Sequence, residues 1–239
     1  MLFNSLDFAI FLPIVFIGYW FVFNRNLRLQ NVFLLLASYY FYACWDWRFL
    51  SLIAFSTGVD FWASKQMAAS RNQVHKRRFL VLSLLVNLGF LGFFKYYNFF
   101  LENFVEAFSL LGIPFQASTL RIILPVGISF YTFQTLSYSI DVYRGKIKAS
   151  DDFIAFAAFV SFFPQLVAGP IERATHLLPQ FYKQREFDYL KAVDGMRQIL
   201  WGLFKKIVIA DNCAEYANLI FNNSGDYSGS TLLLGALFF

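Results

Sequence analysis

Long apolar runs separated by short polar turns dominate the hydrophobic pattern of this chain. Residues 6–23 and 79–94 contain few polar side chains, and residues 31–45 and 49–63 form two shorter runs between them. A helix needs about 20 mainly apolar residues, with a range of roughly 17–25, to cross a bilayer. The four runs are at or just below that length, so the pattern predicts a series of membrane-spanning helices.

The second half of the chain is less regular. Residues 95–113 are aromatic and half-polar, which indicates a segment that lies in the membrane interface. Pro114 opens the break that follows, and Pro164 interrupts the apolar run 153–170. A proline in an apolar segment frees backbone groups, which is tolerated only where protein or water covers them. We therefore expect irregular or re-entrant segments at both prolines.

Residues 188–210 show apolar side chains at every third or fourth position, with charged side chains between them. This separation of faces predicts an amphipathic helix that lies along the membrane surface. The apolar positions are Leu190, Val193, Met196, Leu200, Leu203 and Ile207.

Lysine and arginine gather in one predicted loop, residues 65–78. Arg25 and Arg28 lie in a turn two predicted helices earlier, so both basic segments fall on the same side of the membrane. Short loops rich in lysine and arginine stay in the cytoplasm. We therefore expect a cytoplasmic loop at 65–78 and an extracytoplasmic N-terminus.

The composition favours a membrane protein over a water-soluble one. Hydrophobic residues make up 58% of the 239 residues and charged residues 15%, whereas soluble domains carry about 25% charged residues. The net charge of +5 does not form the basic, aromatic-interleaved face of a nucleic-acid-binding protein. We predict an all-α polytopic integral membrane protein in which residues 1–239 form a single membrane domain.

The segment "LPVGISFYTFQTLSYSIDVYRG", residues 124–145, is long enough to span a membrane but carries a polar stripe. Such a stripe must turn away from lipid, so it either bonds to neighbouring helices or lines a wet cavity. Both alternatives stay open from the sequence. The candidates for lining a substrate channel are Ser129, Thr132, Gln134, Thr135, Tyr138 and Asp141.

Residues with the spacing of a catalytic or metal-binding motif are missing from the sequence. There is no H-E-x-x-H, G-x-S-x-G or phosphate-binding glycine loop, and no ligand spacing typical of a metal site. His75 stands in the basic segment and His176 in a polar one, and we expect a surface or structural role for both. We therefore predict no catalytic residue and no metal ligand within these residues.

Four segments of the chain together resemble the membrane-bound O-acyltransferase family, and in particular its bacterial alginate O-acetyltransferase branch. They are "NLGFLGFFKYYNFF" (87–100), the striped segment 124–145, "FFPQLVAGPIERA" (162–174) and "RQILWGLFKKIVIADN" (197–212), in that order. The resemblance covers nearly the whole chain. It implies a multi-helix acyltransferase fold with a tunnel through the bacterial inner (cytoplasmic) membrane.

The resemblance also implies the chemistry of the whole protein. Acetyl groups from a cytoplasmic donor, acetyl-CoA, would pass across the membrane to an extracytoplasmic polysaccharide such as alginate, with extracytoplasmic acetyltransferases as partner proteins and no bound cofactor. The hallmark of the family is a histidine in a block rich in tryptophan and arginine, which neither His75 nor His176 matches. Since the sequence ends in the apolar run "TLLLGALFF", we expect the N-terminal part of a longer protein, inactive alone.

Other functions remain open at this point. The same fold could transfer D-alanine to teichoic acid. A transporter or channel would use the polar stripe for solute passage without chemistry. A non-catalytic assembly subunit would bind partner proteins and show no turnover.

Overall fold

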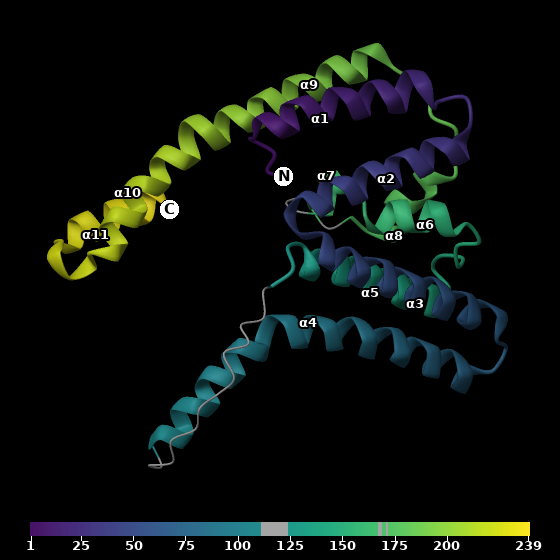
Figure 1. Ribbon diagram of the computed structural model, residues 1–239, viewed down its shortest axis with the longest axis horizontal. Coiled ribbons are helices and arrows are strands. Elements are labelled where there is room, and N and C mark those ends of the chain that lie inside the picture. Colours follow the sequence, from purple (N-terminus) through teal and green to yellow (C-terminus); the bar gives the residue numbers. More distant parts are fainter. Residues whose placement is uncertain (111–123, 167–168, 171) are drawn as a thin grey trace. The chain divides into compact units, whose positions relative to one another are not determined.

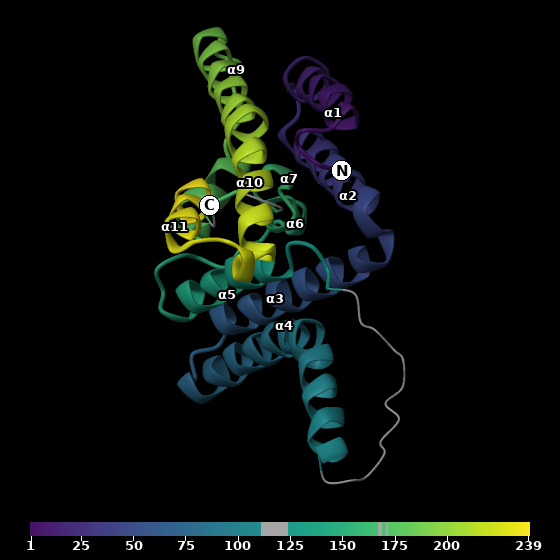
Figure 2. The ribbon, with the colours of Figure 1, turned by 90° about the vertical axis from the view of Figure 1, so that its left-hand side faces the viewer.

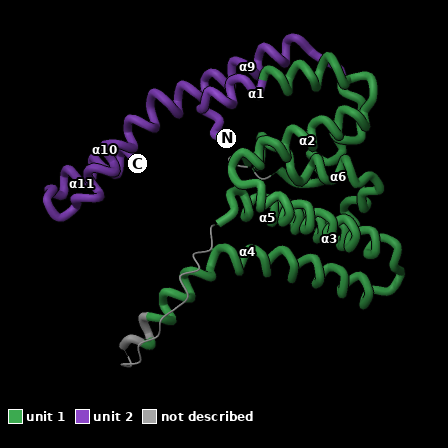
Figure 3. The backbone as a smooth tube through the Cα atoms, in the orientation of Figure 1, with its two compact units in different colours: residues 1, 13–185 green, residues 2–12, 186–239 purple. Residues whose placement is uncertain are grey.

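The computed structural model describes residues 1–110, 124–166, 169–170 and 172–239. Its chain divides into two compact units, residues 13–185 with Met1 and residues 2–12 with 186–239 (Figure 3). Every regular element among the described residues is helical, and none of them is a strand. The predicted all-α fold is therefore confirmed.

Unit 1 is built from a series of consecutive helices. Asn26 and Asp152 each begin a helix, because their side-chain oxygens accept hydrogen bonds from backbone N–H groups of the first turn. The helices are α2 (Leu27–Asp46), α3 (Leu50–Ala69), α4 (Gln73–Leu110), α5 (Ile128–Tyr143), α6 (Phe153–Val160), α7 (Phe163–Leu166) and α8 (Ala174–Leu177). Helix α1 (Leu6–Ile17) is divided between the two units.

The core of unit 1 lies where α3, α4 and α5 run side by side and α6 packs on α2 and α3 (Figures 1 and 2). Large apolar side chains fill it, and Phe41, Ile53, Tyr138, Phe156 and Phe159 are 0–1% exposed. Burial of this apolar surface is the main force that holds the helices together in water-accessible regions. Between helices inside a bilayer, close packing and hydrogen bonds take over that role.

Helix α4 contains most of the segment 95–113, for which the sequence predicts a place in the membrane interface. The helix continues without interruption from Gln73 to Leu110. Residues 111–113 lie outside the described residues, and the place in the interface stays a prediction. The stretch 95–110 contains neither proline nor glycine, so nothing in it breaks a helix. The second half of α4 runs in a different direction from the first (Figures 1 and 2).

One of the helices that the structure describes, Gln73–Val105, is both long and apolar enough to cross a membrane. The shorter apolar stretches are Leu6–Val22, Phe153–Leu166 and Gly229–Phe238. Crossing of the membrane by several helices is therefore still a prediction.

The apolar run 153–170 is indeed irregular. It forms two short helices, α6 and α7, with Pro164 in the first turn of α7. An eight-residue helix such as α6 extends only about 12 Å, less than the hydrocarbon core of about 30 Å. Pro114, the other expected break, lies outside the described residues.

The basic segment 65–78 is not a loop, which corrects the prediction made from its charge. Helix α3 continues to Ala69 and α4 begins at Gln73, so only residues 70–72 are non-helical. Asn72 sets the start of α4, because its side chain accepts a hydrogen bond from the backbone N–H of Val74 at 2.8 Å. Apart from Arg71, the basic side chains therefore stand on two helix ends.

Unit 2 contains the amphipathic helix predicted at 188–210. Asp188 caps α9 (Tyr189–Phe204), which continues through a π-helical stretch, Lys205–Ala210, into α10 (Asp211–Asn222). Helix α11 (Gly229–Phe238) folds back on α10, with Tyr216 and Phe238 in ring contact at 5.8 Å. The helix is thus longer than predicted, while its place in the membrane interface stays a prediction.

Candidate functional site

A buried carboxylate, Asp60, lies at the centre of the polar side chains in unit 1. It stands on α3 and is 0% exposed. The Ser83 hydroxyl donates to its Oδ1 at 2.6 Å, and the Asn87 amide nitrogen lies 2.9 Å from both carboxylate oxygens. A carboxylate removed from water needs such donors, because an unpaired buried charge costs several kcal/mol or more.

The network extends from α3 and α4 onto the polar stripe of α5. The Thr135 hydroxyl lies 3.1 Å from the Asn87 amide oxygen, and the Ser83 and Ser139 hydroxyl oxygens are 2.9 Å apart. Each of these side chains is at most 1% exposed. Hydrogen bonds of this kind therefore fix the rotation of α5 against α3 and α4.

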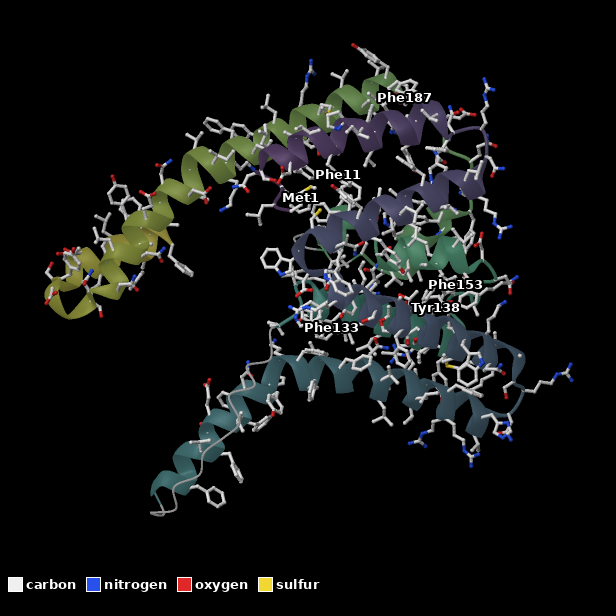
Figure 4. All side chains as sticks on the ribbon, viewed as in Figure 1. Met1, Phe11, Phe133, Tyr138, Phe153 and Phe187 are labelled. Atoms are coloured by element: carbon white, nitrogen blue, oxygen red, sulfur yellow. The ribbon has the colours of Figure 1, made fainter. Side chains whose placement is uncertain are left out.

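Tyr138 forms a second set of polar contacts at the end of α5, and Figure 4 shows it among the crowded side chains of unit 1. Its hydroxyl donates to Ser64 at 3.1 Å and accepts from the Ser150 backbone N–H at 2.9 Å. The Tyr182 hydroxyl donates to the Ser150 hydroxyl at 2.5 Å, and burial raises the pKa of Tyr182. These bonds hold residues after α5 against α3.

The beginning of α5 is set by Gly127. Its φ of +76° lies in the left-handed region, and a Cβ at this position would stand 2.4 Å from the backbone oxygen of Leu166. Only glycine fits both conditions.

Helix α6 lies directly against the middle of α5. The Gln134 amide on α5 donates to the Phe159 carbonyl on α6 at 2.9 Å.

The predicted channel residues lie as follows. Thr132, Gln134, Thr135, Tyr138 and Asp141 are buried, and Ser129 is intermediate. Gln134, Thr135 and Tyr138 bond to neighbouring segments in this structure, which is the geometry of the helix-to-helix alternative. The channel role stays a prediction for all six residues.

Sequence reasoning did not assign Asp60, Ser83 or Asn87 to the site. Their signal was available, since a carboxylate and an amide inside apolar runs are rarely placed there without partners. The missing information was the pairing, because Asp60 and Ser83 are 23 residues apart and Asn87 and Thr135 are 48 apart.

Arg185 forms a separate polar contact at the start of α2. Its guanidinium donates to the side chains of Gln30 at 3.1 Å and Asn31 at 3.0 Å, and it lies over the rings of Tyr19 and Phe181 at 5.4 and 5.2 Å. Burial lowers the pKa of Arg185. The residue therefore ties the polar segment after α8 to α2.

The two histidines lie apart from these networks. His176 is exposed and its Nδ1 is 3.1 Å from a Glu172 carboxylate oxygen, while His75 is exposed in the first turn of α4. In the part of the chain that the structure describes, no three His, Cys, Asp or Glu side chains gather closely enough to hold a metal ion.

Relatives of the chain are O-acetylating proteins. It is 40% identical over 99% of its length to the probable alginate O-acetylase AlgI of Pseudomonas aeruginosa and 39% identical to that of Azotobacter vinelandii. It is 34% identical over 95% of its length to the peptidoglycan O-acetyltransferase of Helicobacter pylori. These matches confirm the resemblance predicted from the four sequence segments.

The chain spans about half the length of the curated relatives it matches, namely 45%, 47% and 48% of these three. No protein-family model matches the chain. No solved structure matches it either.

Proposed function

We propose that this chain, a homologue of bacterial membrane-bound O-acyltransferases, is part of a protein that O-acetylates an extracytoplasmic polysaccharide such as alginate. The observation that carries the proposal is the alignment of 99% of the chain with the alginate O-acetylases. The match to a peptidoglycan O-acetyltransferase also supports acetyl transfer, but it suggests peptidoglycan as the acceptor.

The donor in this proposal is acetyl-CoA from the cytoplasm. Acetyl transfer from a thioester to a hydroxyl breaks the carbon–sulfur bond, forms an ester bond and moves the hydroxyl proton to the thiol. In this proposal the described residues contribute the scaffold of the reaction, because Gln134, Thr135 and Tyr138 bind α5 to its neighbours. The channel candidates on α5 would lie along the route of the acetyl group.

The membrane location is an inner-membrane, multi-pass arrangement with an extracytoplasmic N-terminus. The long apolar helix Gln73–Val105 supports the membrane location. The basic ends of α3 and α4 lie at the same end of unit 1 as the start of α2, where Arg28 stands (Figure 1). Lysine and arginine gathered at one end of a membrane domain mark its cytoplasmic side. Partner acetyltransferases would act on the opposite side.

The test is acetyl transfer by the full-length protein. Inner-membrane vesicles with and without the protein are given acetyl-CoA labelled in the acetyl group, together with alginate or peptidoglycan as acceptor. We expect base-labile label on one acceptor only when the protein is present. Solute flux without labelled ester would overturn the proposal in favour of a transporter. A parallel assay with labelled D-alanine and teichoic acid tests the D-alanine alternative, and label on teichoic acid in that assay alone would overturn acetyl transfer.

A further inference from the structure

A basic cavity of about 650 Å³ opens where α3 ends, α4 begins and the chain leaves α5. Three lysines from three separate segments line it: Lys65, Lys76 and Lys148. Asp151 is the acidic side chain in the lining. The volume is within the roughly 300–1,000 Å³ of small-molecule sites.

The charge of this cavity is only partly neutralised. The Lys65 Nζ lies 3.5 Å from an Asp151 carboxylate oxygen, and Asp151 is largely exposed. Among the described residues, Lys76 and Lys148 have no acidic side chain within 4 Å. Two ammonium groups are therefore available to an anion, while Lys65 is paired with Asp151 and lies over the Phe61 ring at 5.1 Å.

Apolar side chains also line the cavity. Met67 is 1% exposed and Val142 is 8% exposed, and both line the cavity beside Ala68 and Ala69. Ammonium groups and apolar side chains in one lining suit a ligand that joins a charged head to a less polar body.

The segment that carries Lys148 is held in place. Gly145, with a φ of +71°, ends α5 and turns the chain back, and the Lys146 backbone N–H closes the turn on the Asp141 carbonyl at 2.9 Å. Further along, Ser150 is bonded to both Tyr138 and Tyr182. Lys148 is thus anchored on both sides, which lowers the entropic cost of binding an anion.

We infer that this cavity binds a phosphate-bearing ligand, with the phosphate between Lys76 and Lys148 and the less polar part toward the apolar lining at Met67 and Val142. A phosphate oxygen accepts charge-assisted hydrogen bonds from ammonium groups. Two sources share this chemistry, namely a nucleotide-containing acyl donor and the headgroup of an anionic phospholipid. The inference does not need acetyl transfer, because a lipid phosphate would bind whatever the protein's activity.

The test uses the purified full-length protein in a neutral detergent. Pyrophosphate and adenosine 3′,5′-bisphosphate are titrated separately while the thermal unfolding midpoint is followed. Lys76→Gln/Lys148→Gln is compared with Lys146→Gln, a control in the same segment whose side chain does not line the cavity. We expect the double variant to bind at least about tenfold more weakly, as the loss of charge-assisted hydrogen bonds implies, and the control to bind like the wild type.

A second arm identifies the source. Nanodiscs that contain phosphatidylglycerol are compared with nanodiscs of phosphatidylcholine alone. If phosphatidylglycerol weakens bisphosphate binding to the wild type but not to the double variant, the site takes a lipid phosphate; if it has no effect, the soluble nucleotide is the ligand. No binding of either phosphate probe together with no difference between the nanodiscs would overturn the inference, as would an equal loss in Lys146→Gln. Acetyl transfer is measured in a separate assay, so the binding results can be interpreted even if the protein shows no acetyl transfer.

Discussion

Helices α5 and α9 have the same length of 16 residues but opposite surroundings. Ten residues of α5 are buried, among them most of its polar side chains, whereas in α9, all of which is described, no residue is buried. In α5 the polar groups meet partners on α3, α4 and α6. In α9 the polar and apolar residues separate onto two faces, which suits the membrane surface that we propose for it.

The difference shows how the residue pattern of a helix depends on its surroundings. A helix buried on several sides needs a partner for each polar group, so its pattern depends on residues far away in the sequence. A helix at a surface needs only two faces, so its own period of three to four is enough. Substitutions should therefore be costly in and around α5 and nearly neutral in α9.

The largest expected effect follows Asp60→Ala. The change leaves the buried Ser83 hydroxyl and Asn87 amide without their acceptor, and we expect a loss of about 2–5 kcal/mol in the free energy of unfolding. Thermal unfolding of the full-length protein in detergent measures it, with the exposed residue Asp226→Ala as control. An unchanged unfolding midpoint would show that the network does not hold α3, α4 and α5 together.

Gly127→Ala should be the next most damaging. The left-handed backbone costs a non-glycine residue about 1–2 kcal/mol, and the close approach to Leu166 adds to that cost. The matched control is Gly58→Ala in α3, where an added Cβ meets no atom within 4 Å and which we expect to be neutral or slightly stabilising. Equal unfolding midpoints for the two variants would contradict the role of Gly127.

Gln134→Leu and Thr135→Val separate the two interpretations of the polar stripe. Each removes a buried hydrogen bond, and we expect a loss of about 1–2 kcal/mol in stability. If the stripe lines a channel, acetyl transfer per folded molecule also falls. Normal acetyl transfer by the folded variants would support helix-to-helix contact alone. If neither stability nor acetyl transfer changed, both interpretations would be wrong for these two residues.

The smallest effect is expected for Leu200→Ala in α9. Leu200 is 69% exposed, and an exposed substitution of this kind changes the free energy of unfolding by about 0.5 kcal/mol or less. Thermal unfolding in detergent is the measurement. A loss as large as that of Asp60→Ala would mean that α9 is packed inside the full-length protein.

The sequence was sufficient to predict which helices are amphipathic or carry a polar stripe. It was insufficient to predict which side chains on different helices form hydrogen bonds with one another. Periodicity placed the helix at 188–210, and the stripe on α5 was visible because its hydroxyls recur every three or four residues. The partners Asp60 and Asn87 could not be derived, because they belong to other helices and lie 48 or more residues from Thr135 and Ser139 in the chain. The basic residues at 65–78 were wrongly predicted to form a loop, because their charge was given more weight than the absence of a helix-breaking residue.

The hydroxyl of Ser83 carries one hydrogen, yet its oxygen is within hydrogen-bond distance of both Asp60 and Ser139. When Ser83 donates to Asp60, Ser139 must donate to Ser83. Asn87 also donates to Asp60, while the one hydrogen of the Thr135 hydroxyl has two acceptors at 3.1 Å, the Asn87 amide oxygen and the Thr132 carbonyl. The hydrogen bonds from Ser139 through Ser83 to Asp60 therefore all point from α5 toward the carboxylate on α3, so the order of donors and acceptors along this contact is fixed.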